Sequence, residues 1–313
     1  MNIKYFLIAG VALLAVACSG DSDGDSKLAT GSEPVLLCVG DVSGMRAVNN
    51  ADDLLQDGRL TAGKQITVQL TDKGTSPVSY APVLYTVGTY DSQTNLSPLT
   101  PASTQYFPTG SDIKAYAYYP HNASATFTVA ANQDQTATGV ANYLASDLMY
   151  ASNNALTRGV ANTLEFHHLM SKIVVILKPD DGFSSTDLAT TTVTLGTTAT
   201  GEGIITAATF DKTTGTLTAG STREQMTLTT STSTDVKNAA IVVPQNMEGK
   251  KINVTMEGFG TLSYVIADDT TFEPGKEYTY TITVMKKALS VTATISNWSG
   301  ADDPAIPGIG IWQ

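Results

Sequence analysis

The sequence predicts an all-β protein built from two antiparallel β-sandwich domains in tandem. Segments of alternating apolar and polar residues recur at intervals of about ten residues with turn residues between them, which is typical of sandwiches and barrels. Periodicity typical of a helix is nearly absent. The chain has 313 residues, of which 42% are hydrophobic, so it is long enough for about two domains that each bury a core.

Five segments carry the clearest strand patterns. Alternation marks 66–70, 278–284 and 291–295 as strands with one buried face, and their Thr and Tyr residues suit a pleated surface. The runs 172–178 and 239–244 are apolar through their centres. They predict strands buried on both faces, or strands in the middle of a sandwich.

Other local patterns place a hairpin, a helix and a domain boundary. The stretch 209–218 predicts a hairpin because turn residues separate two short strand patterns, and 140–152 has apolar residues at the spacing of one short helix. Residues 151–160 contain Asn, Thr and Gly and form the best candidate boundary. We therefore expect an N-terminal sandwich over 47–157 and a C-terminal sandwich over 158–300.

The first residues have the pattern of a secretory signal followed by a tether. Residues 1–17 carry one Lys, then an apolar run, then small residues, and the run is shorter than the roughly 20 residues needed to span a bilayer core. The ending "AVAC" resembles a bacterial lipoprotein signal, which implies acylation of Cys18 and attachment to the outer membrane. Residues 18–32 predict an acidic flexible tether and resemble the export signal of surface lipoproteins in Bacteroidetes. The alternatives for this stretch are a buried structural cysteine or a Ca²⁺ site, and the latter lacks the Gly and distal Glu of an EF-hand loop.

Composition and motifs argue against nucleic-acid binding and catalysis. The net charge is −11, which offers no electrostatic footprint for nucleic acid. The adjacent His167 and His168 would point to opposite faces of a strand, so they cannot share a metal. Nucleophile-elbow, phosphate-loop and dinucleotide motifs are absent, and the paired acidic residues border turns. We expect neither an enzyme nor a cofactor, although two carboxylates distant in sequence could still form a glycosidase site.

Five motifs occur in a fixed order between residues 113 and 298: "IKAYAYYPHNASATFTV", "DLMYAS", "LEFHHLMSKIVVIL", "AAIVVPQN" and "FEPGKEYTYTITVMKKALSVTATISNW". In this order they resemble the fimbrillin family, the type V pilins and fimbrillin-like surface lipoproteins of Bacteroidales. The resemblance implies transthyretin-like sandwich domains. It also implies export as a lipoprotein, removal of an N-terminal segment by an Arg-specific protease, and polymerisation by donor-strand exchange.

Residues 33–46 are the candidate for the removed segment. Their sequence "EPVLLCVGDVSGMR" contains a predicted strand in which Cys38 is expected to be a small buried side chain. The side chains expected together on one side of this strand are those of Val35, Leu37 and Val39.

The expected cleavage is between Arg46 and Ala47, in a Ser- and Gly-containing loop that a protease could reach. An Arg-specific protease would bind the guanidinium in a bidentate carboxylate pocket. Without the family context, Arg46 would be an ordinary surface arginine. Arg59 and Arg158 are rival sites, and Arg158 ranks last because a cut there would separate the two expected domains.

The C-terminal tail, 301–313, is the candidate donor strand. An exposed run with three Ile residues and a Trp is costly for a monomer and favours a partner. Pro304 and Pro307 each remove a backbone donor and shorten the usable strand, so an anchor or tip role is the alternative for this chain. The residues expected to fill a partner's groove are Ile306, Ile309, Ile311 and Trp312.

The sequence as a whole predicts a structural subunit of a cell-surface fimbria that supports adhesion. The expected partners are other pilin subunits of the same or a different kind, the outer membrane through Cys18 before cleavage, an Arg-specific protease, and host or bacterial surface ligands. The alternative is a surface lipoprotein that stays monomeric and binds glycan or protein ligands.

Overall fold

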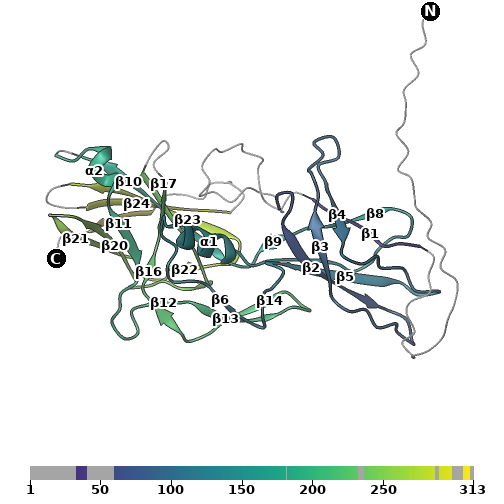
Figure 1. The fold of residues 1–313 in the computed structure, drawn as a ribbon. Helices are drawn as coiled ribbons and strands as arrows, with labels where there is room; N and C mark the ends of the chain where they lie inside the picture. The colour runs from purple at the N-terminus through teal and green to yellow at the C-terminus, as the bar shows by residue number, and fades with distance from the viewer. Residues whose placement is uncertain are drawn as a thin grey trace, which may run out of the picture.

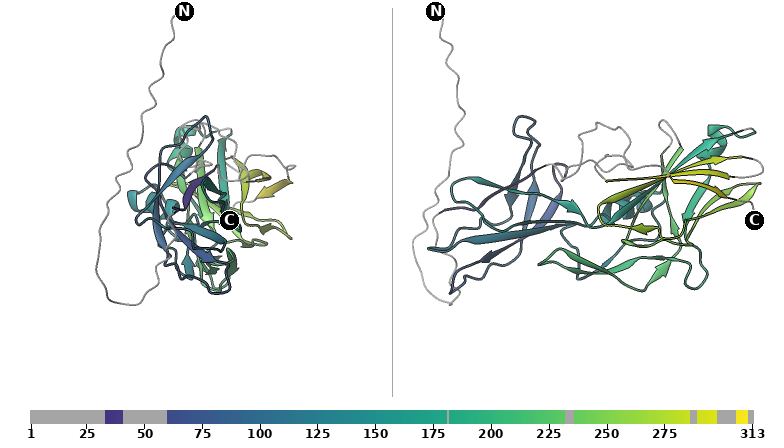
Figure 2. Two further views of the ribbon diagram at one scale, coloured as in Figure 1. Left: turned by 90° about the vertical axis from the view of Figure 1, so that its right-hand side faces the viewer. Right: turned by 180° about the vertical axis from the view of Figure 1, so that it is seen from behind.

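The structure is a computed structural model that describes residues 33–40, 60–180, 182–231, 236–285, 289–297 and the backbone of 306–310. Nearly all of its regular elements are strands, which confirms the all-β prediction. The strands gather in two units that lie end to end along one axis (Figures 1 and 2). The transthyretin-like assignment of these units stays a prediction.

The first unit is one sheet that wraps around an apolar core. Its strand order is β8-β1-β4-β3-β2-β5-β7-β9. The core is built from alternate residues of these strands, as in β3, where Val83, Tyr85 and Val87 are buried. The strands are β1 (Leu36–Val39), β2 (Gln65–Asp72), β3 (Val83–Val87), β4 (Ser97–Pro101), β5 (Ile113–Tyr119), β7 (Met149–Asn153), β8 (Ala161–Leu164) and β9 (His167–His168).

The second unit contains two larger sheets, one of six strands and one of four. The six-stranded sheet runs β17 (Thr229–Ser231), β18 (Val236–Val242), β10 (Ser171–Pro179), β23 (Lys276–Val284), β24 (Leu289–Asn297) and β25 (Ile306–Gly310). The four-stranded sheet runs β16 (Met226–Thr227), β11 (Thr192–Leu195), β20 (Lys251–Met256) and β21 (Gly260–Val265).

Short sheets and two helices complete the second unit. The short sheets are β12 (Ile204–Ile205) with β15 (Arg223–Glu224), β14 (Thr216–Ala219) with β13 (Ala207–Asp211) and β6 (Thr126–Thr128), and β19 (Gln245–Asn246) with β22 (Thr271–Phe272). The helices are α1 (Ala137–Ala145) and α2 (Ser185–Ala189). Thr136 caps α1 by accepting a hydrogen bond from the Gly139 amide, and Ser184 caps α2 through a capping box with Asp187.

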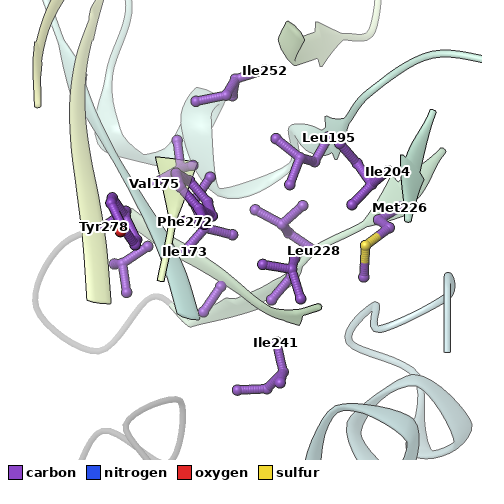
Figure 3. Close-up of a cluster of buried hydrophobic side chains, with 14 of the residues drawn as sticks. Ile173, Val175, Leu195, Ile204, Met226, Leu228, Ile241, Ile252, Phe272 and Tyr278 are labelled. Carbon is purple, nitrogen blue, oxygen red and sulfur yellow. The ribbon is translucent and has the colours of Figure 1, made fainter. Parts of the chain in front are cut away.

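The core of the second unit lies between its two larger sheets. Val175 from β10, Leu195 from β11 and Ile252 from β20 point into it together (Figure 3). The apolar run 172–178 falls within β10, which lies between β18 and β23 and is buried along most of its length, as predicted.

Two ladders differ from the antiparallel expectation. Strand β1 pairs with β8 in parallel, and β10 pairs with β23 in parallel. Alternation of apolar residues is the same in both kinds of ladder, so the sequence pattern does not reveal strand direction.

The two units are interleaved in sequence. Strand β8 follows residue 157 in sequence yet belongs to the sheet of the first unit. Strand β6 and helix α1 precede residue 157 yet pack with the core of the second unit. Along the described residues the chain therefore passes between the units three times, near residues 119–123, 145–149 and 166–170. The expected boundary at 157/158 does not coincide with this division, because a boundary inferred from composition assumes a single crossing.

The predicted hairpin at 209–218 is formed by β13 and β14, and it docks on the first unit. The Tyr150 hydroxyl donates to the Thr213 carbonyl over 2.8 Å, and the rings of Tyr118 and Phe210 meet edge to face at 5.8 Å. Gly215 lies against the Tyr150 ring with φ of 72°, where a Cβ would come within 2.4 Å of a ring carbon. Only glycine fits this turn without displacing the tyrosine.

Candidate functional site

The N-terminal strand β1 is enclosed on both sides. It pairs in parallel with β8, from Leu36 opposite Ala161 to Val39 opposite Leu164, and it pairs antiparallel with β4, where Val39 is opposite Ser97. Hydrogen bonds continue before the strand, because the Val35 amide donates to the Gln105 carbonyl over 2.8 Å. The segment 33–40 is therefore an internal strand of the first sheet, although it lies close to the chain's N-terminus.

The side chains of this strand fill the core of the first unit. Val35, Leu37 and Val39 are each at most 4% exposed, whereas Leu36 is 48% exposed. The expected alternation is thus present, and the three inner side chains belong to the same apolar cluster as Phe107. Burial of each is worth about 1.5 to 3 kcal/mol relative to exposure.

Cys38 is buried on the outer side of β1. It is 3% exposed, and its Sγ lies 3.5 Å from Oγ1 of Thr163 on β8. A Cβ on Gly40 would lie only 3.3 Å from Cγ2 of the same threonine. Thr163 therefore limits the size of the side chains that fit at these two positions.

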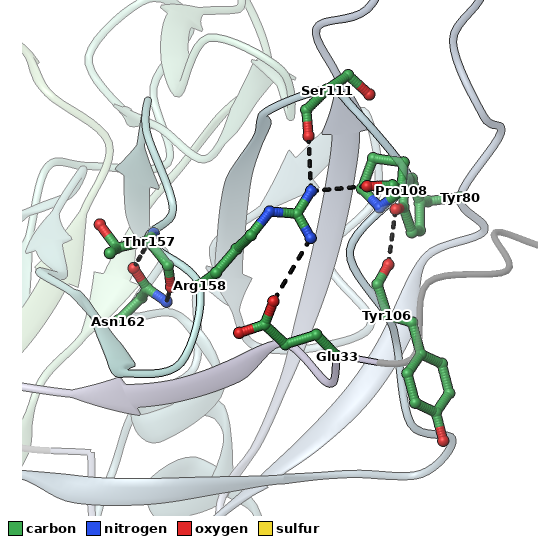
Figure 4. Close-up of polar contacts among 8 residues, drawn as sticks. All are labelled: Glu33, Tyr80, Tyr106, Pro108, Ser111, Thr157, Arg158 and Asn162. Atoms are coloured by element: carbon green, nitrogen blue, oxygen red, sulfur yellow. Dashed lines mark hydrogen bonds and ion pairs between the residues drawn. The ribbon is translucent and has the colours of Figure 1, made fainter.

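Arg158 holds the start of the segment 33–40 through contacts with Glu33, Pro108 and Ser111 (Figure 4). Its Nη2 donates to the carbonyls of Pro108 and Ser111 over 2.6 and 3.0 Å, and its Nη1 lies 3.6 Å from Oε2 of Glu33. Its guanidinium also stacks over the Phe107 ring, with Cζ 4.6 Å from the ring centre. Glu33 and Arg158 are both partly exposed, so the ion pair adds modest energy and mainly fixes position.

The loop that carries Arg158 is fixed by Asn162. The Asn162 side chain accepts a hydrogen bond from the Thr157 amide over 2.7 Å and donates to the carbonyls of Thr157 and Val160 over 2.9 and 3.1 Å (Figure 4). Sequence reasoning missed this role of Asn162, and an Asn in a turn-rich stretch was its only signal.

Asp72 forms a second polar centre near this end of the unit. Burial raises the pKa of its carboxyl group, but hydrogen bonds from Ser111 and from the amides of Val78 and Gly74 outweigh burial and bring the pKa below its ordinary value. Since Ser111 also accepts a hydrogen bond from Arg158, Asp72 belongs to the network that positions the arginine.

The cleavage candidates fall partly outside the described residues. Arg46, Ala47 and Arg59 lie there, as does Cys18. Arg158 is described and is engaged by two carbonyls, a carboxylate and a ring. A cut at Arg158 would fall inside the first unit, so the expectation that it would separate the domains does not hold for this fold.

Part of the candidate donor segment forms strand β25, which pairs antiparallel with β24 from Ile306 opposite Ala293 to Gly310 opposite Leu289. In the part of the chain that the structure describes, β25 is the last strand of its sheet. The backbone at Ile306 and Ile309 is therefore already paired within this chain, while Ile311 and Trp312 lie outside the described residues.

His167 and His168 form the short strand β9. His168 is buried and its Nδ1 lies 2.7 Å from Oδ1 of Asp147, while His167 is exposed, so the pair faces opposite ways as expected. Within the described ranges, no three potential metal ligands come together. None of the helices seen in these ranges is long and apolar enough to cross a membrane.

A sequence model of a family described as fimbrillin-like matches residues 46–298. A search of curated proteins found no match. The fold is similar to the crystal structure of a candidate cell adhesion protein from Bacteroides uniformis, with 23% identity and a TM-score of 0.66, over 85% of this chain and 97% of that chain. It is also similar to a candidate cell adhesion protein from Bacteroides ovatus, with 18% identity and a TM-score of 0.61, over 86% of this chain and 98% of that chain.

Proposed function

Since the chain belongs to the fimbrillin-like family, we propose that it is a structural subunit of a cell-surface fimbria that supports adhesion and polymerises by donor-strand exchange. The subunit would be exported as a lipoprotein acylated at Cys18 and then cleaved between Arg46 and Ala47. Cleavage would release the acidic tether and the strand behind it.

The observation that supports this proposal best is the placement of β1. The strand is internal to the first sheet, yet it lies near the N-terminus, and only the chain through Arg46 connects it to the rest of the unit. One cut there would leave β1 held by non-covalent contacts alone. Its departure would expose unpaired backbone groups on β4 and β8 beside an apolar groove, which a strand from another chain can fill.

The tail supports the donor role through its composition and its present pairing. Among the described residues β25 pairs with β24 and with no second strand, so it can leave by breaking one set of strand hydrogen bonds. The tail's apolar residues are Ile306, Ile309, Ile311 and Trp312, and those on one face of the strand, such as Ile309 and Ile311, would fill a groove that has lost Val35, Leu37 and Val39.

The proposal is tested on the full chain with Cys18→Ser, which prevents acylation. After treatment with an Arg-specific protease, we expect a new N-terminus at Ala47, followed by ladders on non-denaturing gels and filaments by electron microscopy. Arg46→Ala should block both, and Arg59→Ala, the matched control, should block neither.

Deletion of residues 304–313 should leave trimming intact and abolish the ladders. Ladders that persist would place the donor strand elsewhere. A protein that stays monomeric after trimming would contradict the fimbrial role and favour the monomeric ligand-binding lipoprotein, which a glycan array would then examine.

A further inference from the structure

Two segments at opposite ends of the chain share a sequence pattern. Residues 33–40 read "EPVLLCVG" and residues 303–310 read "DPAIPGIG". Both begin with an acidic residue and a proline, carry aliphatic residues at the third, fourth and seventh positions, and end in glycine. The first segment occupies the groove of the first unit, so the groove's contacts show what each position requires.

The groove favours small residues at the sixth and eighth positions. At the sixth, Cys38 packs against Thr163, and at the eighth, a Cβ on Gly40 would press on the same threonine. The second segment has Gly308 and Gly310 at these positions, which satisfy both limits. At the seventh position, Ile309 would replace the buried Val39 with one extra methylene.

A tail that enters the groove in the direction of β1 has its acidic residue at the correct end to meet Arg158. Strand β1 runs parallel to β8, and β8 leads through β9 into β10 of the second unit. Glu33 and Arg158 therefore lie at the end of the groove remote from the second unit. A strand entering there in the direction of β1 presents its acidic residue to Arg158.

On the basis of the function proposed above, we infer that Arg158 sets the register of strand exchange by binding the carboxylate of Asp303 from a second copy of this chain. Residues 303–310 of that copy then occupy the positions of residues 33–40. Arg158 is held by Pro108 and Ser111 independently of Glu33, so the guanidinium remains in place when the first strand leaves.

The same register explains why the first strand must leave before the tail can bind. Ala305 fills less of the core than Val35, Gly308 fills less than Cys38, and Pro307 lacks the amide that Leu37 carries. The tail is thus the weaker occupant. It binds only after cleavage has allowed the better one to dissociate.

Disulfide trapping tests the register directly. The parent for these variants is the full chain with Cys18→Ser. When Thr163→Cys is added to the uncleaved parent, the new cysteine should form an internal disulfide with Cys38, which checks the geometry. With Cys38→Ser as well, Thr163→Cys combined with Gly308→Cys should link neighbouring subunits after cleavage. Pro307→Cys and Ile309→Cys are the controls displaced by one residue, and we expect at least about tenfold less linkage from each.

Charge reversal tests the role of Arg158. The acceptor chain, which supplies the groove, carries Glu33→Arg and Arg158→Glu, so its internal ion pair is kept with the charges exchanged. The donor chain, which supplies the tail, carries Asp303→Arg. The donor should assemble about fivefold more slowly on the parent and recover on the reversed acceptor, in line with a partly exposed ion pair. Asp302→Arg, the neighbouring acid, should not recover in this way.

The outcomes separate the two proposals. The register is overturned if polymers form normally but the disulfide to Thr163→Cys forms from position 307 or 309, or does not form from position 308. This outcome leaves the fimbrial role intact. Equal behaviour of Asp302→Arg and Asp303→Arg removes Arg158 from the mechanism. A parent chain that forms no ladders after cleavage overturns both the fimbrial role and the register.

Discussion

Strands β1 and β25 lie near opposite ends of the chain and are held in different ways. The segment 33–40, which contains β1, has a neighbouring strand on each side and three buried aliphatic side chains, and Arg158 pairs with its first residue, Glu33. Strand β25 has one pairing partner, β24, in the described part of the chain, and it contains one proline and two glycines in five residues. Proline and glycine both weaken a strand.

Strand β1 therefore contributes more to the stability of the fold, whereas β25 detaches more easily. Removing β1 would expose apolar surface worth several kcal/mol, so the strand is firmly held in the intact chain. Detaching β25 breaks one short ladder. The chain thus pairs a tightly held strand with a loosely held one, and the following predictions test that contrast from the largest expected effect to the smallest.

Truncation of one inner side chain of β1 should give the largest change. Leu37→Ala should lower the free energy of unfolding by about 2 to 4 kcal/mol, because it leaves a cavity in the core of the first unit. The neighbouring Leu36→Ala is the matched control and should change it by less than about 0.5 kcal/mol. Urea denaturation measures both, and similar losses for the two would contradict the placement of β1.

Hydrogen exchange on the unmodified chain compares the two strands directly. Amides of 37–39 should exchange only through large-scale opening, whereas those of 308–310 should exchange about 100-fold faster through local detachment of β25. Mass spectrometry of peptides from the two ends gives the ratio. Equal protection would mean that β25 is as firmly held as β1.

Replacement of Arg158, which contacts Glu33 just before β1, should lower the free energy of unfolding by a smaller amount. Arg158→Met keeps an apolar stem over Phe107 but removes the hydrogen bonds to Pro108 and Ser111 and the pair with Glu33. We expect a loss of about 1 to 2 kcal/mol in the free energy of unfolding. Arg223→Met, which removes a single 3.3 Å contact to Gly203 in the second unit, should cost less. A larger loss there would argue against a special role for Arg158.

Acid should weaken the first unit slightly through Asp72. Its carboxyl pKa is lower in the folded chain than the ordinary 3.8, so the unfolded chain binds more protons in that range. The stabilisation is complete above the ordinary value and is lost as the pH falls through the folded one. Asp72→Asn should flatten the fall in the urea midpoint between pH 5 and pH 3, and an unchanged slope would show that Asp72 does not contribute.

Local pattern predicted the strands better than their partners. The alternation of Val35, Leu37 and Val39 and the hairpin at 209–218 followed from residue types alone. Burial of Cys38 depends on Thr163, and the contact of Glu33 with Arg158 joins residues 125 positions apart in sequence, so neither partner could be identified locally. The ordered motifs, by contrast, indicated the family before any contact was known.

The expected helix at 140–152 shows how a short apolar pattern can mislead. The helix covers Ala137–Ala145 and ends at Ser146, whose amide donates to the carbonyls of Asn142 and Tyr143. Leu148 and Met149 have helix-like spacing, yet Met149 begins β7 in the first unit. Pairing with β5 and β9 decided their conformation, and the sequence of this segment alone does not contain that information.

The three crossings between the units have a mechanical consequence for the proposed filament. Tension applied along the subunit axis would be shared by three covalent connections instead of one. A single proteolytic cut at any crossing would leave two connections intact, so the subunit would keep both halves joined. If the chain releases its first strand after one cut, as proposed, its two units would still stay joined after a single further cut at one of these crossings.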